Sequence, residues 1–330
     1  MDRLRRKTIS ALVAAPAVVG MGARTASAQG AYPTRSLTFI VPQAAAGSTD
    51  TVARLTAQRL GLALGQQVVV ENRPGAGGII GADLVAKAQP NGYTLLVAGT
   101  GIVAINPFLY KNISYDPVRS FRPVALIAYS TDVLVVNPAV PVKTLAELVA
   151  LARAHPGEIK YASAGNGTSP HLTAELFQQV TQTRLMGVPY KGSTPAVVAT
   201  VSGETSMMFT GIASSIGHIK SGRLRAISVS SAERSPSLPD VPTARESGLP
   251  QFEVNYWIGL LAPAGTPDDV IEILNRNVNK MLALPEVREK FASVGIEPVG
   301  GSTSDFADLI RKDLELWGKT IAASNIKGDD

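Results

Sequence analysis

Four short polar segments carry the residue types that could do chemistry in this chain. Each contains glycine, follows an apolar run typical of a β-strand and precedes a helical pattern. Glycine leaves backbone N–H groups uncovered, and free N–H groups at a helix start favour anions through hydrogen bonds and the helix dipole. The segments span residues 42–50, 99–106, 163–171 and 190–195. Together they predict a site at which main-chain amides hold a small acid.

The candidate ligand-binding residues in these segments are glycines, small residues and polar side chains. They are Gln43, Ala44, Ala46, Gly47, Ser48 and Asp50; Thr100, Gly101 and Asn106; Ser163, Gly165, Asn166, Gly167, Thr168, Ser169 and His171; and Tyr190, Lys191 and Gly192. Simpler roles remain open at each position. Asp50 and its neighbours can be helix caps, the glycines can serve turns, and Lys191 can be a solvated charge.

Other chemistries find little support in the sequence. The chain has no cysteine, which excludes disulfides and thiolate chemistry, and it lacks a Gly-x-Ser-x-Gly elbow. His155, His171 and His218 lie in different predicted elements, so no local zinc site is indicated, and we expect neither a metal nor catalysis. Residues 75–81 form a loose dinucleotide-type glycine pattern, but the next strand ends at residues 98–101 without an acid to hold a ribose. We therefore expect no cofactor.

Residues 71–78, ENRPGAGG, predict a strand end, a proline–glycine turn and a helix start. Glycines in such a turn have two possible roles: they can leave backbone N–H groups accessible to an anion, or they can allow segments to pack closely. Both interpretations remain open from the sequence.

The first 28 residues have the features of an export signal. Arg3, Arg5, Arg6 and Lys7 precede a short apolar stretch, and residues 26–28 fit a small-residue cleavage site. The arginine pair also resembles a twin-arginine signal, and both export routes remain open. Removing residues 1–28 lowers the net charge from +5 to about +1, so no basic stripe indicates nucleic acid. We expect a protein exported by a bacterium to the periplasm, cleaved near Ala28.

Apolar runs and helical periodicity alternate along the rest of the chain. Strands are predicted at residues 37–41, 68–70, 94–98, 124–129, 133–137, 160–163, 187–190, 206–209, 226–230 and 254–261, and helices at 51–64, 79–88, 145–154, 172–180, 194–201, 214–221, 268–282, 286–294 and 303–323. The first three strands alternate with helices as βαβαβ, which predicts a parallel sheet with helices on both faces. The whole order indicates an α/β fold with two lobes and a ligand cleft between them. We expect residues 31–129 and 255–330 to form lobe 1 and residues 130–254 to form lobe 2, joined by two crossing strands.

Several motifs together resemble the substrate-binding proteins of tripartite tricarboxylate transporters, the TctC or Bug family. The motifs are YPTRSLTFIVP (32–42), VVVENRPGAGG (68–78), PNGYTLL (90–96), INPFLY (105–110), VPYKGSTPA (188–196), HIKSGRLRAISV (218–229), LPDVPT (238–243) and GLLAPAGTP (259–267). The resemblance implies a type II periplasmic binding protein fold that closes about a hinge on a small carboxylate. It also implies delivery of that acid to the membrane permease of a tripartite transporter. We expect a monomer.

Three departures from the family pattern bear on the ligand. Ala46 replaces a glycine of the first loop, Gln43 stands where an aromatic is common, and Ser206 and Thr210 occupy positions that often hold aspartates. Thr210 is added to the candidate binding residues for this reason. Loss of an acid there relaxes a preference for an amino group, so we expect a dicarboxylic or uncharged-tail acid. A receptor that presents ligand to a signalling partner, and an exported enzyme on the same fold, are the alternatives.

Overall fold

The computed structural model describes residues 32–43, 45, 47–165, 167–190, 192–324 and 326. The chain divides into two units, Met1–Tyr32 and Pro33–Asp330, and both β-sheets belong to the second unit. The predicted export signal at residues 1–28 lies outside the described residues. Within the part of the chain that is described, every helix is too short or too polar to cross a bilayer.

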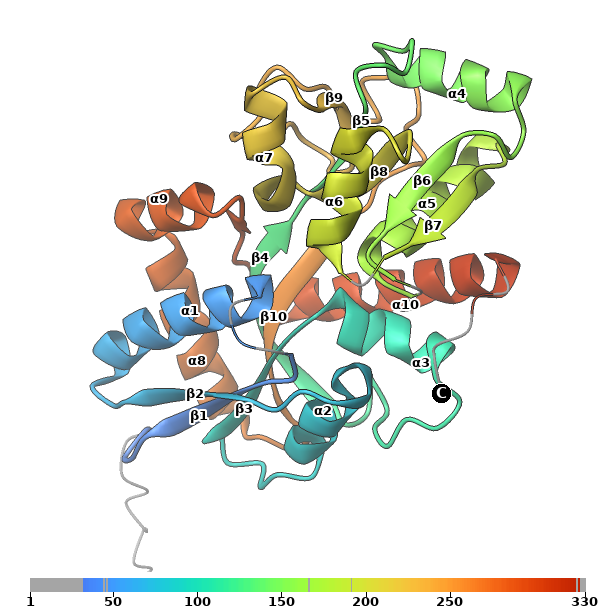
Figure 1. Ribbon diagram of the computed structural model, residues 1–330. Helices are drawn as coiled ribbons and strands as arrows, with labels where there is room; N and C mark the ends of the chain where they lie inside the picture. Colours follow the sequence, from blue (N-terminus) through green and yellow to red (C-terminus); the bar gives the residue numbers. More distant parts are fainter. Residues whose placement is uncertain are drawn as a thin grey trace, which may run out of the picture. The chain divides into compact units, whose positions relative to one another are not determined.

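Two mixed β-sheets organise residues 33–330 (Figure 1). The six-stranded sheet has the order β11 (Glu297–Pro298), β4 (Phe121–Ser130), β10 (Tyr256–Pro263), β3 (Thr94–Gly99), β1 (Leu37–Val41) and β2 (Val68–Asn72). The five-stranded sheet has the order β7 (Met186–Pro189), β6 (Lys160–Ser163), β8 (Met207–Gly211), β5 (Asp132–Val136) and β9 (Arg225–Val229). The parallel pairing predicted for the first three strands is confirmed. By contrast, β10 pairs antiparallel with β3 and β4, and β5 pairs antiparallel with β8 and β9.

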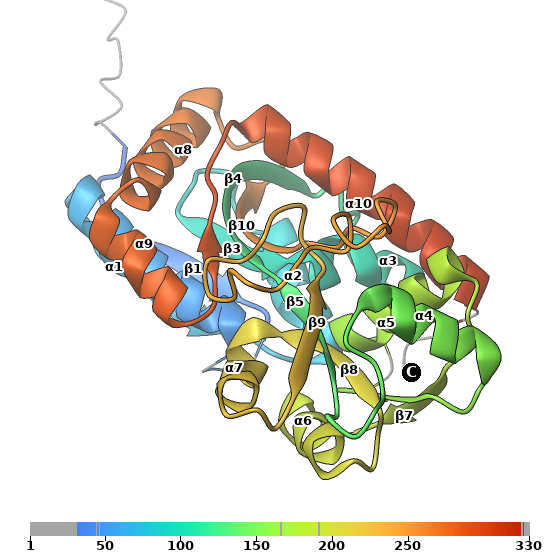
Figure 2. The same ribbon diagram turned by 90° about the horizontal axis from the view of Figure 1, so that it is seen from above.

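Helices cover the six-stranded sheet on both faces, as the alternating pattern predicts. The α-helices of the described residues are α1 (Ser48–Leu64), α2 (Ile79–Ala86), α3 (Asn106–Leu109), α4 (Leu145–Ala154), α5 (Ser169–Thr181), α6 (Ser193–Ser202), α7 (Ile212–Lys220), α8 (Asp268–Leu282), α9 (Pro285–Ser293) and α10 (Thr303–Ser324). Helices α1 and α8 pack together on one side of the strands. Helices α2 and α10 lie on the other side in the two views (Figures 1 and 2), and they contribute to one buried cluster.

The chain passes between the two sheets in two neighbouring segments. Strand β4 ends at Ser130 in the six-stranded sheet, and β5 begins at Asp132 in the five-stranded sheet, so only Thr131 lies between them. On the return, the backbone N–H of Val254 donates to the Ser230 carbonyl, and β10 begins two residues later. Tyr256 is the ladder partner of Ser130, so the two passages are hydrogen-bonded neighbours.

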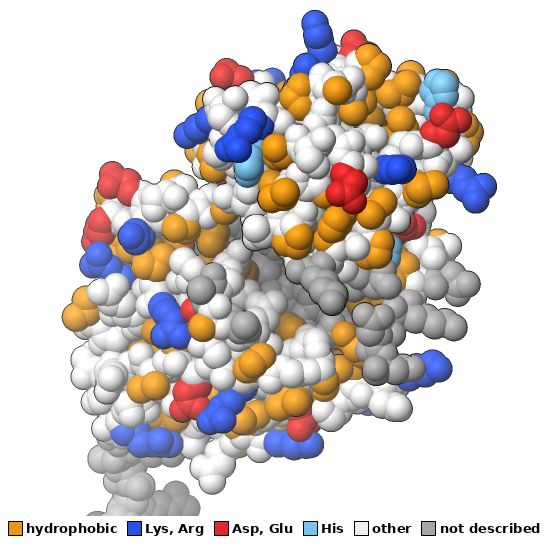
Figure 3. Space-filling model, viewed as in Figure 1, with side chains coloured by type: hydrophobic (Ala, Val, Ile, Leu, Met, Phe, Trp, Pro, Cys, Tyr) orange, Lys and Arg blue, Asp and Glu red, His pale blue; other side chains and the backbone are white. Residues whose placement is uncertain are grey.

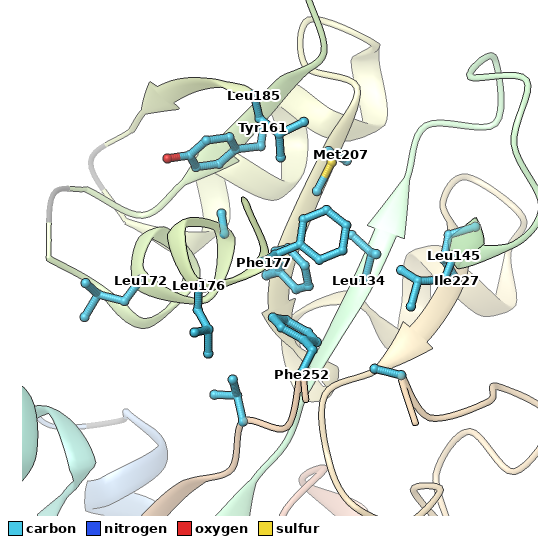
Figure 4. Packing of buried hydrophobic residues seen from close by; sticks show 14 of the residues in the cluster. Leu134, Leu145, Tyr161, Leu172, Leu176, Phe177, Leu185, Met207, Ile227 and Phe252 are labelled. Atoms are coloured by element: carbon cyan, nitrogen blue, oxygen red, sulfur yellow. The ribbon is translucent and has the colours of Figure 1, made fainter. Parts of the chain in front are cut away.

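Aromatic rings fill the core around the five-stranded sheet (Figure 4). The ring centroids of Phe177, Phe209 and Phe252 lie 5.5–5.6 Å apart in tilted and edge-to-face pairs. Such pairs contribute about 0.5–1.5 kcal/mol each beyond the area they bury. Because Phe252 belongs to the returning segment, this cluster holds that segment against α5 and β8.

A short helix replaces one of the predicted loops. Residues 99–106 were expected to form a polar loop, but Gly101–Ile105 forms one turn of π-helix (η2) that continues into α3. Residues 102–105 are all buried, so burial rather than polarity determines the conformation there. The two-residue strand β11 was also not predicted.

The glycines of residues 71–78 allow close packing. Strand β2 ends at Asn72, and the 3₁₀ turn η1 (Ala76–Gly78) leads into α2 as predicted. Gly78 has φ +93°, and a Cβ there would lie 2.2 Å from Ile102 Cδ1 and 3.0 Å from the Pro42 carbonyl oxygen. A Cβ on Gly81 would lie 2.7 Å from the Arg73 carbonyl oxygen. Of the two interpretations of this segment, the structure supports the packed corner.

We expect Gly78→Ala to lower the free energy of unfolding by about 3 kcal/mol, because a methyl group adds overpacking to backbone strain. Gly65→Ala is the matched control, since Gly65 has φ +65° and nothing within 4 Å of a built Cβ. It should lose only the strain, about 1 kcal/mol. Urea unfolding of the three proteins measures both losses, and equal losses would show that close packing at Gly78 is unimportant.

Candidate functional site

A cavity of about 700 Å³ lies where elements of both sheets meet. Its volume falls in the range of small-molecule sites, roughly 300–1,000 Å³. The described residues that line it are Gln43, Ala45, Gly47, Ser48, Thr49, Gly99, Thr100, Gly101, Ser130, Ser169, Gly192, Ser193, Tyr256, Trp257 and Ile258. None of these side chains carries a charge at neutral pH. The described lining residues can therefore bind a ligand through hydrogen bonds and dipoles.

The surface of the molecule is hollowed between the parts that are built on the two sheets (Figure 3). The Lys, Arg, Asp and Glu side chains that Figure 3 shows in colour lie on the two parts to either side of the hollow.

Four helical segments begin at the cavity. The starts are Ser48 of α1, Gly101 of η2, Ser169 of α5 and Ser193 of α6. None of the four N-cap residues makes a side-chain cap hydrogen bond. First-turn N–H groups without a side-chain cap are donors, and they add the positive end of the helix dipole. The arrangement can hold anionic oxygens from opposite sides.

The structure brings seven of the predicted site residues to this cavity, from all four predicted segments. They are Gln43, Gly47, Ser48, Thr100, Gly101, Ser169 and Gly192. Four other candidates, Ala44, Ala46, Asn166 and Lys191, lie outside the described residues. The remaining candidates are not among the lining residues, and their contacts are described one by one below.

Asp50 lies in the first turn of α1, where it supports the first loop. Its carboxylate accepts hydrogen bonds from Arg54 Nε at 3.0 Å and Asn72 Nδ2 at 2.9 Å, and only 3% of the residue is exposed. Asn72 Nδ2 also donates to the carbonyl oxygen of Gln43 at 3.1 Å. Asp50 thus ties α1 and β2 to the loop at Gln43, and the N-cap of α1 is Gly47.

Other candidates are buried or bonded elsewhere. Asn106 Nδ2 donates to the Gly77 carbonyl at 2.9 Å, and Tyr190 donates to Glu204 Oε1 at 2.8 Å. Thr210 and Ser163 are 1% and 2% exposed, and the Thr210 hydroxyl has no hydrogen-bond partner among the described residues.

The turn before α5 holds two further candidates in structural roles. Gly167 has φ +70°, and a Cβ there would lie 2.7 Å from Leu109 Cδ1, so this residue packs against α3. Thr168 Oγ1 donates to the Gly165 carbonyl at 2.6 Å. These contacts shape the turn itself.

His171 holds the loop before α5 in place. The N–H of Gly167 donates to His171 Nδ1 at 3.0 Å, so the ring proton of the neutral imidazole lies on Nε2. Nε2 is 3.9 Å from Glu175 Oε1, and the ring stacks on Tyr161 at 6.4 Å between centroids. Burial lowers the pKa of His171, although the Glu175 carboxylate acts in the opposite direction. The ligand contact expected of His171 stays a prediction, and the structure shows that its ring also bonds to the loop before α5.

We expect His171 to make stability fall in acid. Since its pKa is lowered in the folded state, the unfolded chain takes up the proton first as pH drops below about 6.5. The stabilisation is present above that value and is lost as pH falls toward the folded pKa. In His171→Gln the position no longer titrates, so urea unfolding should show a smaller loss between neutral and acid pH. An unchanged pH profile in the variant would contradict this role.

The lining residues at the passages between the sheets were not predicted from the sequence. Tyr256 donates its hydroxyl proton to the Ser169 carbonyl at 3.1 Å, and the N–H of Trp257 donates to Thr100 Oγ1 at 3.0 Å. The indole Nε1 of Trp257 donates to Asp313 Oδ2 at 2.7 Å. Tyr256 and Trp257 have the sequence pattern of a buried strand. Their position next to the expected crossing near residue 255 is the sequence feature that could have indicated a place in the cavity wall.

Comparison with known proteins identifies the family. The family model described as "Tripartite tricarboxylate transporter family receptor" matches residues 52–326. The chain belongs to the TctC family. A curated relative from Pseudomonas sp. (strain P51), a UPF0065 protein in the tcbD-tcbE intergenic region, is 43% identical over 292 residues, covering 88% of this chain and 87% of the relative.

Solved TctC-like structures share the fold. A structure of an R. palustris protein with adipate has a TM-score of 0.76 and 35% identity, covering 90% of this chain and 99% of that one. MatC from Rhodopseudomonas palustris with bound malate has a TM-score of 0.72 and 34% identity, covering 88% and 100%. The type II periplasmic binding protein fold expected from the sequence is confirmed.

Proposed function

We propose that this TctC-family protein captures a small organic acid in the cavity between its two sheets. The observation that carries the proposal is the convergence of four helical N-termini without side-chain caps, from both sheets, on one cavity whose described lining side chains are all uncharged. Helix starts stabilise carboxylates through N–H donors and the dipole. The two family structures that contain adipate and malate agree with an acid as the cargo.

The lining favours an acid without an amino group. No carboxylate side chain is among the described lining residues, so an ammonium group entering the cavity would lose its hydration without gaining an anionic partner. Helical starts on both sides offer separate places for two carboxylates. A dicarboxylic acid or an acid with an uncharged tail therefore fits better than an amino acid.

Binding proceeds by closure about the two passages between the sheets. Residues 31–129 and 255–330 would form one lobe and residues 130–254 the other, with Thr131 and the segment at Asn255 as the hinge. Ligand stabilises the closed arrangement only through contacts made there, which here come from helix starts on both lobes. The proposed setting is the periplasm, where the protein would hand its acid to the permease of a tripartite tricarboxylate transporter without altering it.

We expect adipate and malate to raise the midpoint of thermal unfolding, because a ligand present at 100 times its Kd adds about 2.7 kcal/mol to stability. Aspartate and glutamate should bind at least about tenfold more weakly, as their ammonium group finds no carboxylate among the described lining residues. A thermal-shift screen followed by calorimetry tests both statements. Tight binding of aspartate or glutamate, with none of the simple acids, would overturn the ligand class.

Gly101→Ala should weaken binding of the acid found in that screen by about tenfold, or about 1.4 kcal/mol. Gly101 lines the cavity at the start of η2, and a Cβ there meets nothing within 4 Å, so the fold tolerates the methyl group. Gly217→Ala in α7 is the matched control, because its Cβ also meets open space but lies away from the lining. Calorimetry on both variants should show a loss only for Gly101→Ala, and equal affinities would remove the start of η2 from the site.

A further inference from the structure

Three oxygen–oxygen contacts run from a buried carboxyl group to the wall of the cavity. Asp132 Oδ2 lies 3.2 Å from Thr173 Oγ1, and Thr173 Oγ1 lies 2.9 Å from the Tyr256 hydroxyl. The Tyr256 hydroxyl lies 3.1 Å from the Ser169 carbonyl oxygen. Tyr256 and Ser169 line the cavity, whereas Asp132 and Thr173 are 4% and 0% exposed. The contacts join β5, α5 and β10 at the point where the chain passes between the sheets.

Counting hydrogens assigns the direction of these contacts. Each hydrogen bond needs one proton between its two oxygens, and a hydroxyl supplies only one. Thr173 and Tyr256 together supply two protons for three contacts, and the Ser169 carbonyl can only accept. All three contacts are hydrogen bonds only when Asp132 carries the third proton and donates it to Thr173. Thr173 then donates to Tyr256, and Tyr256 donates to Ser169.

The charge surroundings of Asp132 agree with a neutral acid. Burial raises the pKa of Asp132 to about 7, and the Thr173 contact opposes this. None of the ion pairs in the described part of the chain involves Asp132. The Tyr256 phenol on β10 stays protonated, because burial, with Asp132 adding to it, raises its pKa well above 10.

The other ionisable groups near this chain of contacts have their own partners. On α10, Asp313 accepts from the Trp257 indole, and burial raises its pKa to about 6. On α5, His171 and Glu175 lie next to each other, and Glu175 accepts from Tyr161. In the sheet, Asp132 pairs with Gly211 of β8, and its main-chain carbonyl accepts from the N–H of Ser230, the residue after β9; neither of these groups titrates.

We propose that Asp132 is a neutral, positioning acid and that it makes anion binding in the cavity proton-linked. While Asp132 is neutral, Tyr256 donates its proton to the Ser169 carbonyl and fixes the start of α5. The buried carboxyl group near the cavity wall then carries no negative charge. On ionisation, Thr173 turns its proton to Asp132 and Tyr256 turns its proton to Thr173. Ser169 then loses its donor, and a buried negative charge opposes the incoming acid. The bound anion and the proton therefore stabilise each other.

The first test needs no ligand. Infrared difference spectra of the free protein at neutral pH, wild type minus Asp132→Asn, should contain the carbonyl stretch of a protonated carboxylic acid. The difference spectrum of wild type minus Asp313→Asn shows whether the second buried carboxyl group, Asp313, also absorbs as a protonated acid. The proposal is overturned if the Asp132 difference spectrum shows only carboxylate bands.

The second test rests on the proposed function and uses adipate as the probe. The Kd of the wild type should rise about tenfold per pH unit above the pKa of the free protein, because only the protonated form binds well. Asp132→Asn keeps a donor toward Thr173 at every pH, so its Kd should be independent of pH. Asp313→Asn should keep the wild-type slope. The proposal would be overturned if the Kd of Asp132→Asn still depended on pH as in the wild type, or if the Kd of Asp313→Asn did not depend on pH.

The two tests separate the two ideas. If adipate and malate fail to bind at any pH, the ligand assignment fails, while the infrared spectrum still decides whether Asp132 is neutral. If adipate binds with one Kd at all pH values, the ligand assignment stands and the proton linkage is wrong. Calorimetry in buffers of different ionisation enthalpy adds a direct readout: above the pKa of Asp132, the wild type should take up a proton on binding, and Asp132→Asn should take up none.

Discussion

The backbone pairing of β4 with β10 is the constraint on which the rest of the structure depends. These strands carry the chain out of the six-stranded sheet and back into it, and they meet with Ser130 opposite Tyr256. Because both passages share one hydrogen-bonded ladder, the chain crosses between the two sheets at one place. Ser130, Tyr256 and Trp257 therefore lie beside these passages and in the cavity wall at once. Any motion of one sheet against the other acts directly on the site.

Local signals were sufficient to predict most elements of the fold. The bounds of α4 agree with the prediction because Thr144 caps the helix and accepts from the N–H of Glu147, whose carboxylate in turn accepts from the Lys143 N–H. Partners within a sheet depend on long-range pairing instead. The insertion of β10 between β3 and β4 joins segments that are far apart in the chain, and its antiparallel direction has no local signature. Residues 101–105 form a turn of π-helix in which residues 102–105 are buried, and their sequence does not reveal this burial.

Part of the cavity lining could be predicted from the sequence because glycine and serine at strand ends mark places where backbone N–H groups are accessible. Gly47, Ser48, Gly101 and Gly192 are of this kind. Polar side chains were harder to place, since the same residue type can face a ligand or tie two loops together. Asp50 bonds to Asn72, and Asn106 to the Gly77 carbonyl, across 22 and 29 residues. Only the tertiary neighbours decide between the two roles.

The position of Trp257 gives the molecule an intrinsic reporter. The chain has two tryptophans, and Trp257 is 1% exposed yet forms part of the cavity wall, with its indole N–H bound to the carboxyl of Asp313. Trp317 is also buried but stacks on Tyr256, whose hydroxyl contacts the same wall. Both fluorophores are thus coupled to the cavity in the unlabelled protein. Their emission is therefore expected to respond to a ligand that enters the cavity.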